Sequence, residues 1–150
     1  MGDFAKGYLS VALASLVSQT LLNNQSSITA ITVVVSLAVV LGHIYPVFYS
    51  FKGGKGVATT FGILFATSFT LGGLASLVWV ITFLITKISG VAAISTALAL
   101  PIISFFVIKM EYLQEFWLIY VMLCIISALI LFRHSANILE LRRGKKKNES

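Results

Sequence analysis

Most residues of this chain that could do chemistry lie in two short stretches. The first, residues 42–60, reads GHIYPVFYSFKGGKGVATT and places Lys52 and Lys55 among three glycines. Glycines let consecutive backbone N–H groups converge without obstruction, so such a loop forms a concavity that binds anions. The helix expected to begin near Val57 adds unpaired N–H groups and the positive end of its dipole. The loop predicts a phosphate site made of Lys52, Gly53, Gly54, Lys55, Gly56 and Val57.

This loop is not a nucleotide-binding Walker A loop. That pattern needs a glycine five positions before the glycine of its Gly-Lys pair, and a Ser or Thr directly after the lysine. Here Tyr49 stands at the position of the first glycine, and Gly56 follows Lys55. Nucleotide hydrolysis is therefore not expected. A second interpretation stays open on local grounds, namely a flexible loop whose lysines only anchor the membrane topology.

The second stretch follows the last apolar run and contains Arg133, His134 and Asn137. His134 and Asn137 are three residues apart, so they share one face of a helix. Polar groups at membrane depth are costly unless they meet partners, which makes both functional candidates. The alternative is that Arg133 and His134 only reach toward the interface.

Ser89 is a weaker candidate, because hydroxyls in membrane helices usually bond to their own backbone. A serine hydrolase is not favoured either, since the sequence contains no Gly-x-Ser-x-Gly elbow. Neither His43 nor His134 has a third metal-ligating residue near it in the pattern, so we expect no metal and no cofactor.

The composition requires that these residues be held by a membrane protein. The chain is 58% hydrophobic and 11% charged, with a mean hydropathy of +0.98, whereas soluble domains are about half apolar and a quarter charged. Its apolar runs are continuous rather than alternating, which indicates helices and not barrel strands. The net charge of +6 is concentrated in a basic tail, which is typical of an anchor on anionic headgroups and not of nucleic-acid binding. Cys124 lies in an apolar run and is expected to be a small hydrophobic residue.

Apolar segments cover residues 4–22, 28–48, 57–86, 89–108 and 115–133. The third would be about 45 Å long as one helix, against a hydrocarbon core of roughly 30 Å. We expect it to break at Thr70-Leu71-Gly72-Gly73. Six spans then put every lysine and arginine except Lys109 on the cytoplasmic side, whereas five spans would separate the glycine-loop lysines from the basic tail. The prediction is an all-α, polytopic membrane protein of about six transmembrane helices with both ends cytoplasmic.

The two stretches together resemble the bacterial acyl-phosphate:glycerol-3-phosphate acyltransferase family, often called PlsY. Its second motif, Gly-His-x-x-Pro-x-Phe-x-x-Phe-Lys-Gly-Gly-Lys-Gly-Val-Ala-Thr, is matched throughout from Gly42 to Thr59. Its third motif departs at Glu140, where the family usually carries a basic residue. Ser89 falls where the family tends to have a serine that contacts substrate. The third motif is matched at Arg133, His134, Asn137, Ile138, Leu141 and Gly144.

The resemblance implies transfer of a fatty acyl group from acyl phosphate to the 1-hydroxyl of glycerol 3-phosphate, giving lysophosphatidic acid and phosphate. The partners would be these two substrates and membrane lipids, with no nucleic acid and no protein partner. The protein would be a multi-pass protein of the inner, cytoplasmic membrane with its active site facing the cytoplasm. The implied catalytic residues are His43, Lys55, Ser89, His134 and Asn137.

Members of the family look like seven-span proteins with a first motif, rich in Ser, Gly, Asn and Arg, between spans one and two. Residues 3–7 of this chain, Asp-Phe-Ala-Lys-Gly, resemble the start of the second span. We therefore expect residues 1–150 to form a single acyltransferase-like domain that is N-terminally incomplete relative to the family. The alternatives are a catalytically inactive truncated paralogue or fragment that only binds phosphate or lipid, and, less favoured, an anion transporter, because no internal repeat is visible.

Overall fold

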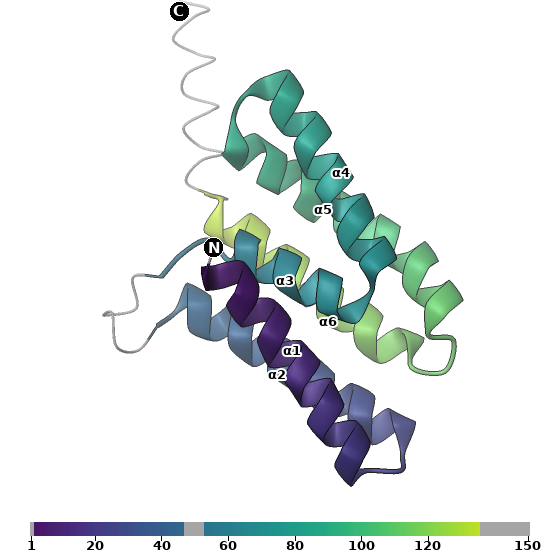
Figure 1. Ribbon diagram of the computed structural model, residues 1–150. Coiled ribbons are helices and arrows are strands. Elements are labelled where there is room, and N and C mark those ends of the chain that lie inside the picture. The colour runs from purple at the N-terminus through teal and green to yellow at the C-terminus, as the bar shows by residue number, and fades with distance from the viewer. Residues whose placement is uncertain (1, 47–52, 136–150) are drawn as a thin grey trace, which may run out of the picture.

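Six α-helices make up the part of the chain that the computed structural model describes, residues 2–46 and 53–135 (Figure 1). In chain order they are α1 (Gly2–Leu21), α2 (Gln25–Ile44), α3 (Val57–Thr67), α4 (Phe69–Thr86), α5 (Ser89–Glu111) and α6 (Phe116–Arg133). By length and composition, α2, α4, α5 and α6 can each cross a membrane. The predicted all-helical membrane fold is confirmed.

The two remaining helices differ from those four in different ways. α1 has 20 residues, as many as α2, but it is more polar because it carries Asp3, Lys6 and Gln19. α3 has only 11 residues, so it extends for roughly 16 Å at the usual rise and covers about half of a hydrocarbon core. The helix that follows the glycine loop is therefore a half-span.

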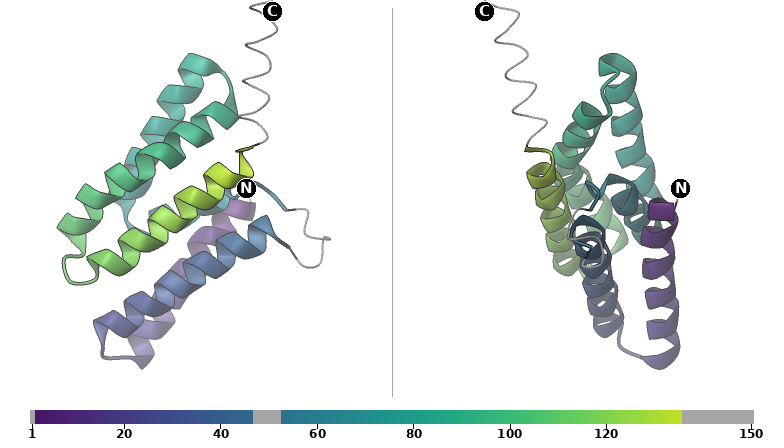
Figure 2. Two further views of the ribbon diagram at one scale, coloured as in Figure 1. Left: turned by 180° about the vertical axis from the view of Figure 1, so that it is seen from behind. Right: turned by 90° about the vertical axis from the view of Figure 1, so that its left-hand side faces the viewer.

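α3 occupies the middle of the bundle. α1 and α2 form one antiparallel pair and α4 and α5 another, with α3 and α6 between the two pairs (Figures 1 and 2). α3 packs against α1, α2 and α4, while α6 packs against α5 and α2. The buried core where these helices meet includes Val40, Ile63, Leu64, Leu100 and Ile126.

The first turns of α1 and α3 touch through their backbones. A Cβ added at Gly7 would overlap the carbonyl oxygen of Thr59, and one added at Gly62 would overlap the carbonyl oxygen of Phe4. Small residues allow such close approach, which is how membrane helices gain packing contacts without a hydrophobic driving force. This contact holds the start of α1 against the helix that follows the glycine loop.

The predicted break in the apolar segment 57–86 is present, but it lies at Ser68 and not at Thr70-Leu71-Gly72-Gly73. Ser68 is extended, with φ −157° and ψ 124°, and its hydroxyl accepts a hydrogen bond of 3.1 Å from the N–H of Leu71. On the other side of the break, the hydroxyl of Tyr112 donates to the carbonyl of Thr67 at 2.6 Å. The break falls at the serine because a hydroxyl can satisfy backbone groups at a helix end, whereas glycine offers no side chain.

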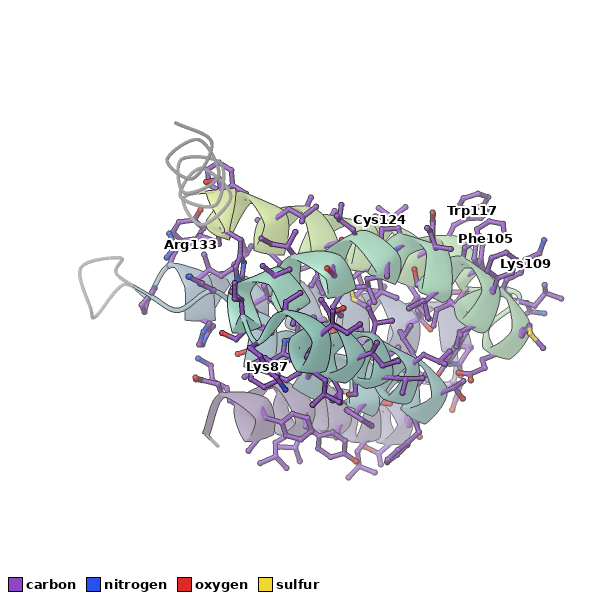
Figure 3. The ribbon with its side chains drawn as sticks, turned by 90° about the horizontal axis from the view of Figure 1, so that it is seen from above. Lys87, Phe105, Lys109, Trp117, Cys124 and Arg133 are labelled. Carbon is purple, nitrogen blue, oxygen red and sulfur yellow. The ribbon has the colours of Figure 1, made fainter. Side chains whose placement is uncertain are left out.

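Cationic side chains differ between the two ends of the bundle. Figure 3 shows Arg133 and Lys87 at one end and Lys109 at the other. The ammonium group of Lys109 lies 5.5 Å from the ring centroid of Phe105, next to Trp117 in the same view. Aromatic and basic side chains of this kind are typical of a membrane–water interface. The glycine loop lies at the opposite end, beside Arg133.

Candidate active site

The glycine loop turns the chain from α2 into α3 and presents backbone N–H groups at the turn. Gly56 is the residue before α3 and has φ 82° and ψ −6°, a left-handed conformation that favours glycine. Its carbonyl accepts a hydrogen bond of 2.9 Å from the N–H of Thr60. The amides of the first turn, from Val57 onward, have no intrahelical carbonyl to bind. The loop and the helix start therefore offer donors for an anion.

His43 packs against this loop and supports it. A Cβ added at Gly54 would overlap the imidazole Nε2 of His43, and one added at Gly53 would overlap the carbonyl oxygen of His43. The side chain of His43 is 12% exposed, and its Nδ1 lies 3.3 Å from Oδ1 of Asp3 in α1. A carboxylate at Nδ1 orients the imidazole ring, so α1 contributes to the position of the loop.

Arg133 at the end of α6 holds the loop from another side. Its Nη2 donates to the carbonyl oxygen of Gly53 at 3.1 Å and lies 3.5 Å from that of Gly54. The guanidinium carbon also lies 5.4 Å from the ring centroid of Tyr45. Because these contacts engage loop carbonyls, they favour a loop conformation in which the N–H groups point elsewhere.

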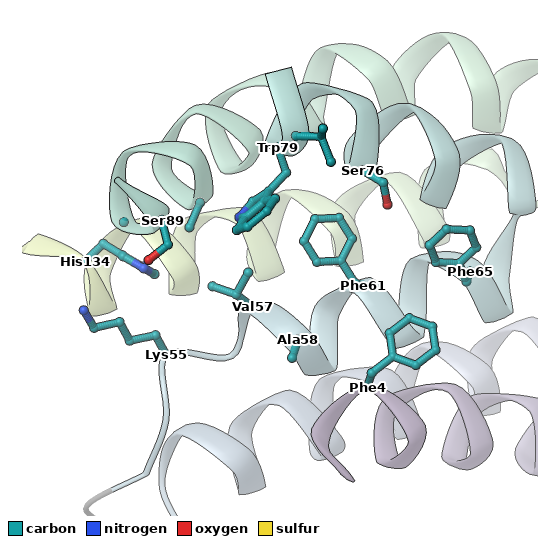
Figure 4. Close-up of a pocket in the computed structure, with 13 residues that line it drawn as sticks. Phe4, Lys55, Val57, Ala58, Phe61, Phe65, Ser76, Trp79, Ser89 and His134 are labelled. Atoms are coloured by element: carbon teal, nitrogen blue, oxygen red, sulfur yellow. The ribbon is translucent and has the colours of Figure 1, made fainter. Parts of the chain in front are cut away.

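A pocket of about 580 Å³ opens beside the loop, between α1, α3, α4, α5 and the end of α6 (Figure 4). Its polar end is formed by Lys55, Ser89 and His134, which Figure 4 shows close together. The rest of its lining is mainly apolar and includes Phe4, Val57, Phe61, Phe65, Trp79 and Val80. A pocket with one cationic end and one apolar end is suited to an amphiphilic anion.

Two helix starts meet at the polar end of the pocket. Val57 opens α3 and Ser89 opens α5, and both line this pocket. Each helix start carries unpaired N–H groups and a partial positive charge of about half an elementary charge. Together with the ammonium group of Lys55, they create a positive environment that is suited to a phosphate dianion.

His134 is the buried titratable side chain at this end of the pocket. It is 2% exposed, and its Nδ1 lies 2.8 Å from the carbonyl oxygen of Ile130. A carbonyl only accepts hydrogen bonds, so Nδ1 must carry the proton in this contact. In the neutral ring Nε2 is then an acceptor, which is the state required to bind or accept the proton of a substrate hydroxyl.

The structure brings four of the residues predicted from the sequence to one pocket: Lys55, Val57, Ser89 and His134. The glycines at 53, 54 and 56 form the adjoining loop, and His43 lies behind it and does not line the pocket. Two further predicted site residues, Lys52 and Asn137, lie outside the described residues.

Two contacts of the loop were missed by sequence reasoning. The sequence places Asp3 in a family-like helix start and Arg133 in the second stretch and the third-motif match, but neither pattern predicts contact with the glycine loop. The bond from Arg133 to Gly53 joins residues 80 positions apart, and no spacing rule within one helix reports such a contact. The available signal was that Arg133 directly precedes a candidate histidine. In residues 2–46 and 53–135, no group of three or more His, Cys, Asp or Glu side chains could hold a metal ion.

Fold and pocket together define a polytopic helical membrane protein whose pocket is cationic at one end and apolar at the other. The family model for glycerol-3-phosphate acyltransferase matches residues 1–144. This chain belongs to the glycerol-3-phosphate acyltransferase family.

Named relatives and solved structures agree with this assignment. The chain is 38% identical to a glycerol-3-phosphate acyltransferase of Nitrosomonas eutropha over 145 residues, covering 97% of this chain and 68% of the relative. It is 39% identical to one of Neisseria meningitidis over the same shares.

Two crystal structures of PlsY (YgiH), an integral membrane glycerol 3-phosphate acyltransferase, share the fold. The lysophosphatidic acid form has a TM-score of 0.76 at 33% identity, covering 95% of this chain and 66% of that protein. The glycerol 3-phosphate form has a TM-score of 0.74 at 34% identity, covering 95% and 64%. The chain thus spans about two thirds of the length of these relatives.

Proposed function

We propose that this chain transfers a fatty acyl group from acyl phosphate to the 1-hydroxyl of glycerol 3-phosphate, giving lysophosphatidic acid and inorganic phosphate. The observation that carries the proposal is the pocket itself, with Lys55, His134 and two helix starts at one end and an apolar lining at the other. Both substrates carry a phosphate and one carries an alkyl chain, so this arrangement suits them. The relatives' names and the glycerol 3-phosphate and lysophosphatidic acid forms of PlsY support the same reaction.

In this proposal the glycine loop binds a substrate phosphate. Backbone N–H groups of the loop and of the first turn of α3 donate to its oxygens, and Lys55 neutralises its charge. The conformation of the loop is held by Arg133 and by the contact between His43 and Asp3. Lys52 and Asn137 are assigned to the site from the sequence alone.

The chemistry needs no enzyme nucleophile, because acyl phosphate is already an activated mixed anhydride. The 1-hydroxyl oxygen of glycerol 3-phosphate attacks the acyl carbonyl carbon, and the bond from that carbon to the phosphate oxygen breaks. The hydroxyl proton passes to the departing phosphate, either directly or by way of Nε2 of His134, and the phosphate leaves as hydrogen phosphate. Positioning and charge stabilisation supply the catalysis.

The proposed orientation puts the active site and both chain ends on the cytoplasmic side. Lys55, Lys87 and Arg133 belong to the end of the bundle that carries the site, and Lys109 belongs to the other end. Cytoplasmic loops are enriched in lysine and arginine, which supports this choice. In a bacterium the membrane would be the inner, cytoplasmic membrane.

The test is direct assay of the purified protein in lipid nanodiscs. With glycerol 3-phosphate and hexadecanoyl phosphate we expect lysophosphatidic acid by mass spectrometry and an equal amount of released phosphate. Hexadecanoyl-coenzyme A in place of the acyl phosphate should give no product, because the proposed donor is the phosphate anhydride. Absence of lysophosphatidic acid with either donor, from protein that shows cooperative thermal unfolding, would contradict the proposed reaction.

Lys55→Met and Lys109→Met form a matched pair for the same assay. Both remove one lysine charge, but only Lys55 lines the pocket. A hydrogen bond to a charged group contributes about 1.5–3 kcal/mol, so Lys55→Met should lower kcat/KM by roughly tenfold to a hundredfold. Lys109→Met should remain close to wild type. Equal effects of the two changes would argue against a phosphate site at Lys55.

A further inference from the structure

The apolar part of the pocket runs along one face of α3. Val57, Ala58, Phe61 and Phe65 line it at intervals that repeat with the helical turn. Phe65 is eight residues beyond Val57, so it lies about 12 Å further along the helix axis. Figure 4 shows Phe65 at the far end of the pocket from Lys55, Ser89 and His134, with Phe61 between them.

The ring of Phe65 is held in place from several directions. A Cβ added at Gly72 would lie 2.6 Å from Cγ of Phe65, so the ring rests directly on the backbone of α4. The ring of Phe4 packs edge-on against it with centroids 6.0 Å apart, and the ring of Phe69 does so at 5.9 Å. Such edge-to-face contacts are favourable and directional. Phe65 is therefore a fixed wall and not a freely rotating side chain.

We propose that Phe65, braced by Phe4 and Gly72, closes the tail end of the pocket and sets the length of the acyl chain that the protein accepts. The identity of the occupant, an acyl chain whose phosphate lies at Lys55, depends on the proposed function. The closed end of the pocket depends only on the packing of Phe65. Each methylene that fits inside the pocket strengthens binding about fourfold, the factor expected for burying one CH₂ group. Methylenes beyond the wall add nothing or overpack the site.

The first experiment measures binding and needs no turnover. The thermal unfolding midpoint is recorded with a series of n-alkyl phosphates from octyl to octadecyl phosphate, in one detergent and at one ligand concentration for every variant. Ligand that binds the folded state raises the midpoint, and partitioning into micelles is common to all variants and cancels in the comparison. For wild type we expect the midpoint to rise with alkyl-chain length and to level off within the series.

Phe65→Ala should move this levelling-off to longer chains, and Phe65→Trp should move it to shorter ones. Phe61→Ala is the matched control, because Phe61 lines the middle of the pocket and its loss should weaken binding of all lengths alike.

The second experiment measures turnover with dodecanoyl and octadecanoyl phosphate. The ratio of kcat/KM for the two donors does not depend on the fraction of folded enzyme, so a partly unstable variant still gives a valid result. A shift of two methylenes changes this ratio roughly fifteenfold. We expect Phe65→Ala to favour the octadecanoyl donor by about that factor, and Phe65→Leu serves if the alanine variant does not fold.

The possible outcomes separate this inference from the proposed reaction. A shifted binding profile without lysophosphatidic acid would support the length limit and contradict the reaction. Product formation with length profiles identical in wild type, Phe65→Ala and Phe65→Trp would overturn the length limit and leave the reaction standing. That result would mean that the chain leaves the pocket sideways, for example past Val80, which is 45% exposed.

Discussion

Replacing Arg133 by lysine keeps a positive charge beside the glycine loop but removes the planar fork of guanidinium donors. In the structure this fork donates to the carbonyl of Gly53 at 3.1 Å and lies over the ring of Tyr45. A hydrogen bond from a charged donor contributes about 1.5–3 kcal/mol, and a cation–π contact contributes on the order of 0.5–1 kcal/mol. Because lysine retains the charge and part of the attraction, we expect a net loss of about 1.5–2 kcal/mol in loop positioning. That corresponds to a rise of roughly tenfold to thirtyfold in KM.

The assay is the KM for glycerol 3-phosphate at saturating hexadecanoyl phosphate, with the thermal unfolding midpoint recorded on the same samples. Arg133→Lys should raise KM more than it lowers kcat, and Arg133→Ala should raise KM further. Lys109→Arg, a reverse exchange at the opposite end of the bundle, is the control and should change neither value. A wild-type KM for Arg133→Lys alongside an impaired Arg133→Ala would refute the reasoning, since charge alone would then account for the effect.

Four further changes have defined outcomes. Gly62→Ala places a Cβ on a backbone carbonyl of α1 and should lower the free energy of unfolding by about 1–3 kcal/mol. Gly73→Ala is the control, because a Cβ there meets nothing within 4 Å and the free energy of unfolding should not change. Chemical denaturation measures both variants. His134→Ala should lower kcat by a factor on the order of 10²–10⁴ if Nε2 accepts the hydroxyl proton, while circular dichroism shows the fold retained. Burial raises the pKa of Tyr112 above 10.0, so the contribution of the neutral phenol to stability is present below that pH and is lost as the pH rises through the pKa of the folded state. At alkaline pH the thermal unfolding midpoint of Tyr112→Phe should therefore fall less steeply than that of wild type. Asp3→Asn removes the charge that orients the histidine behind the loop, and a loss of about 1 kcal/mol should raise the KM for glycerol 3-phosphate roughly fivefold.

The half-span α3 shows how far the sequence alone can be read. The sequence correctly predicts a break, because an unbroken helix from 57 to 86 would be too long for a bilayer. The break itself depended on which residue could satisfy the exposed backbone groups. Ser68 caps α4 with its hydroxyl, and the phenol of Tyr112, from the end of α5, satisfies the carbonyl of Thr67. The second partner lies 45 positions away in the chain, so local patterns did not reveal it.

The sequence by itself determined the membrane class, the helical content, the family and the types of residue that we propose to bind phosphate. These follow from properties that lie within a few consecutive residues: hydropathy over a span, glycines in a turn, and lysine beside a helix start. The same local reading also singled out Lys55, Ser89 and His134, which the structure brings to one pocket.

Only the tertiary structure decided which side of the loop each residue occupies. His43 and His134 are equally plausible bases in the sequence, but packing puts His43 behind Gly54 and His134 in the pocket wall. The aromatic end wall at Phe65 depends in the same way on a glycine of α4 and a ring of α1. These contacts join separate helices, and their geometry is set by how closely the helix backbones approach. That approach depends on side-chain volumes across the whole bundle and not on the neighbours of any one residue in the chain.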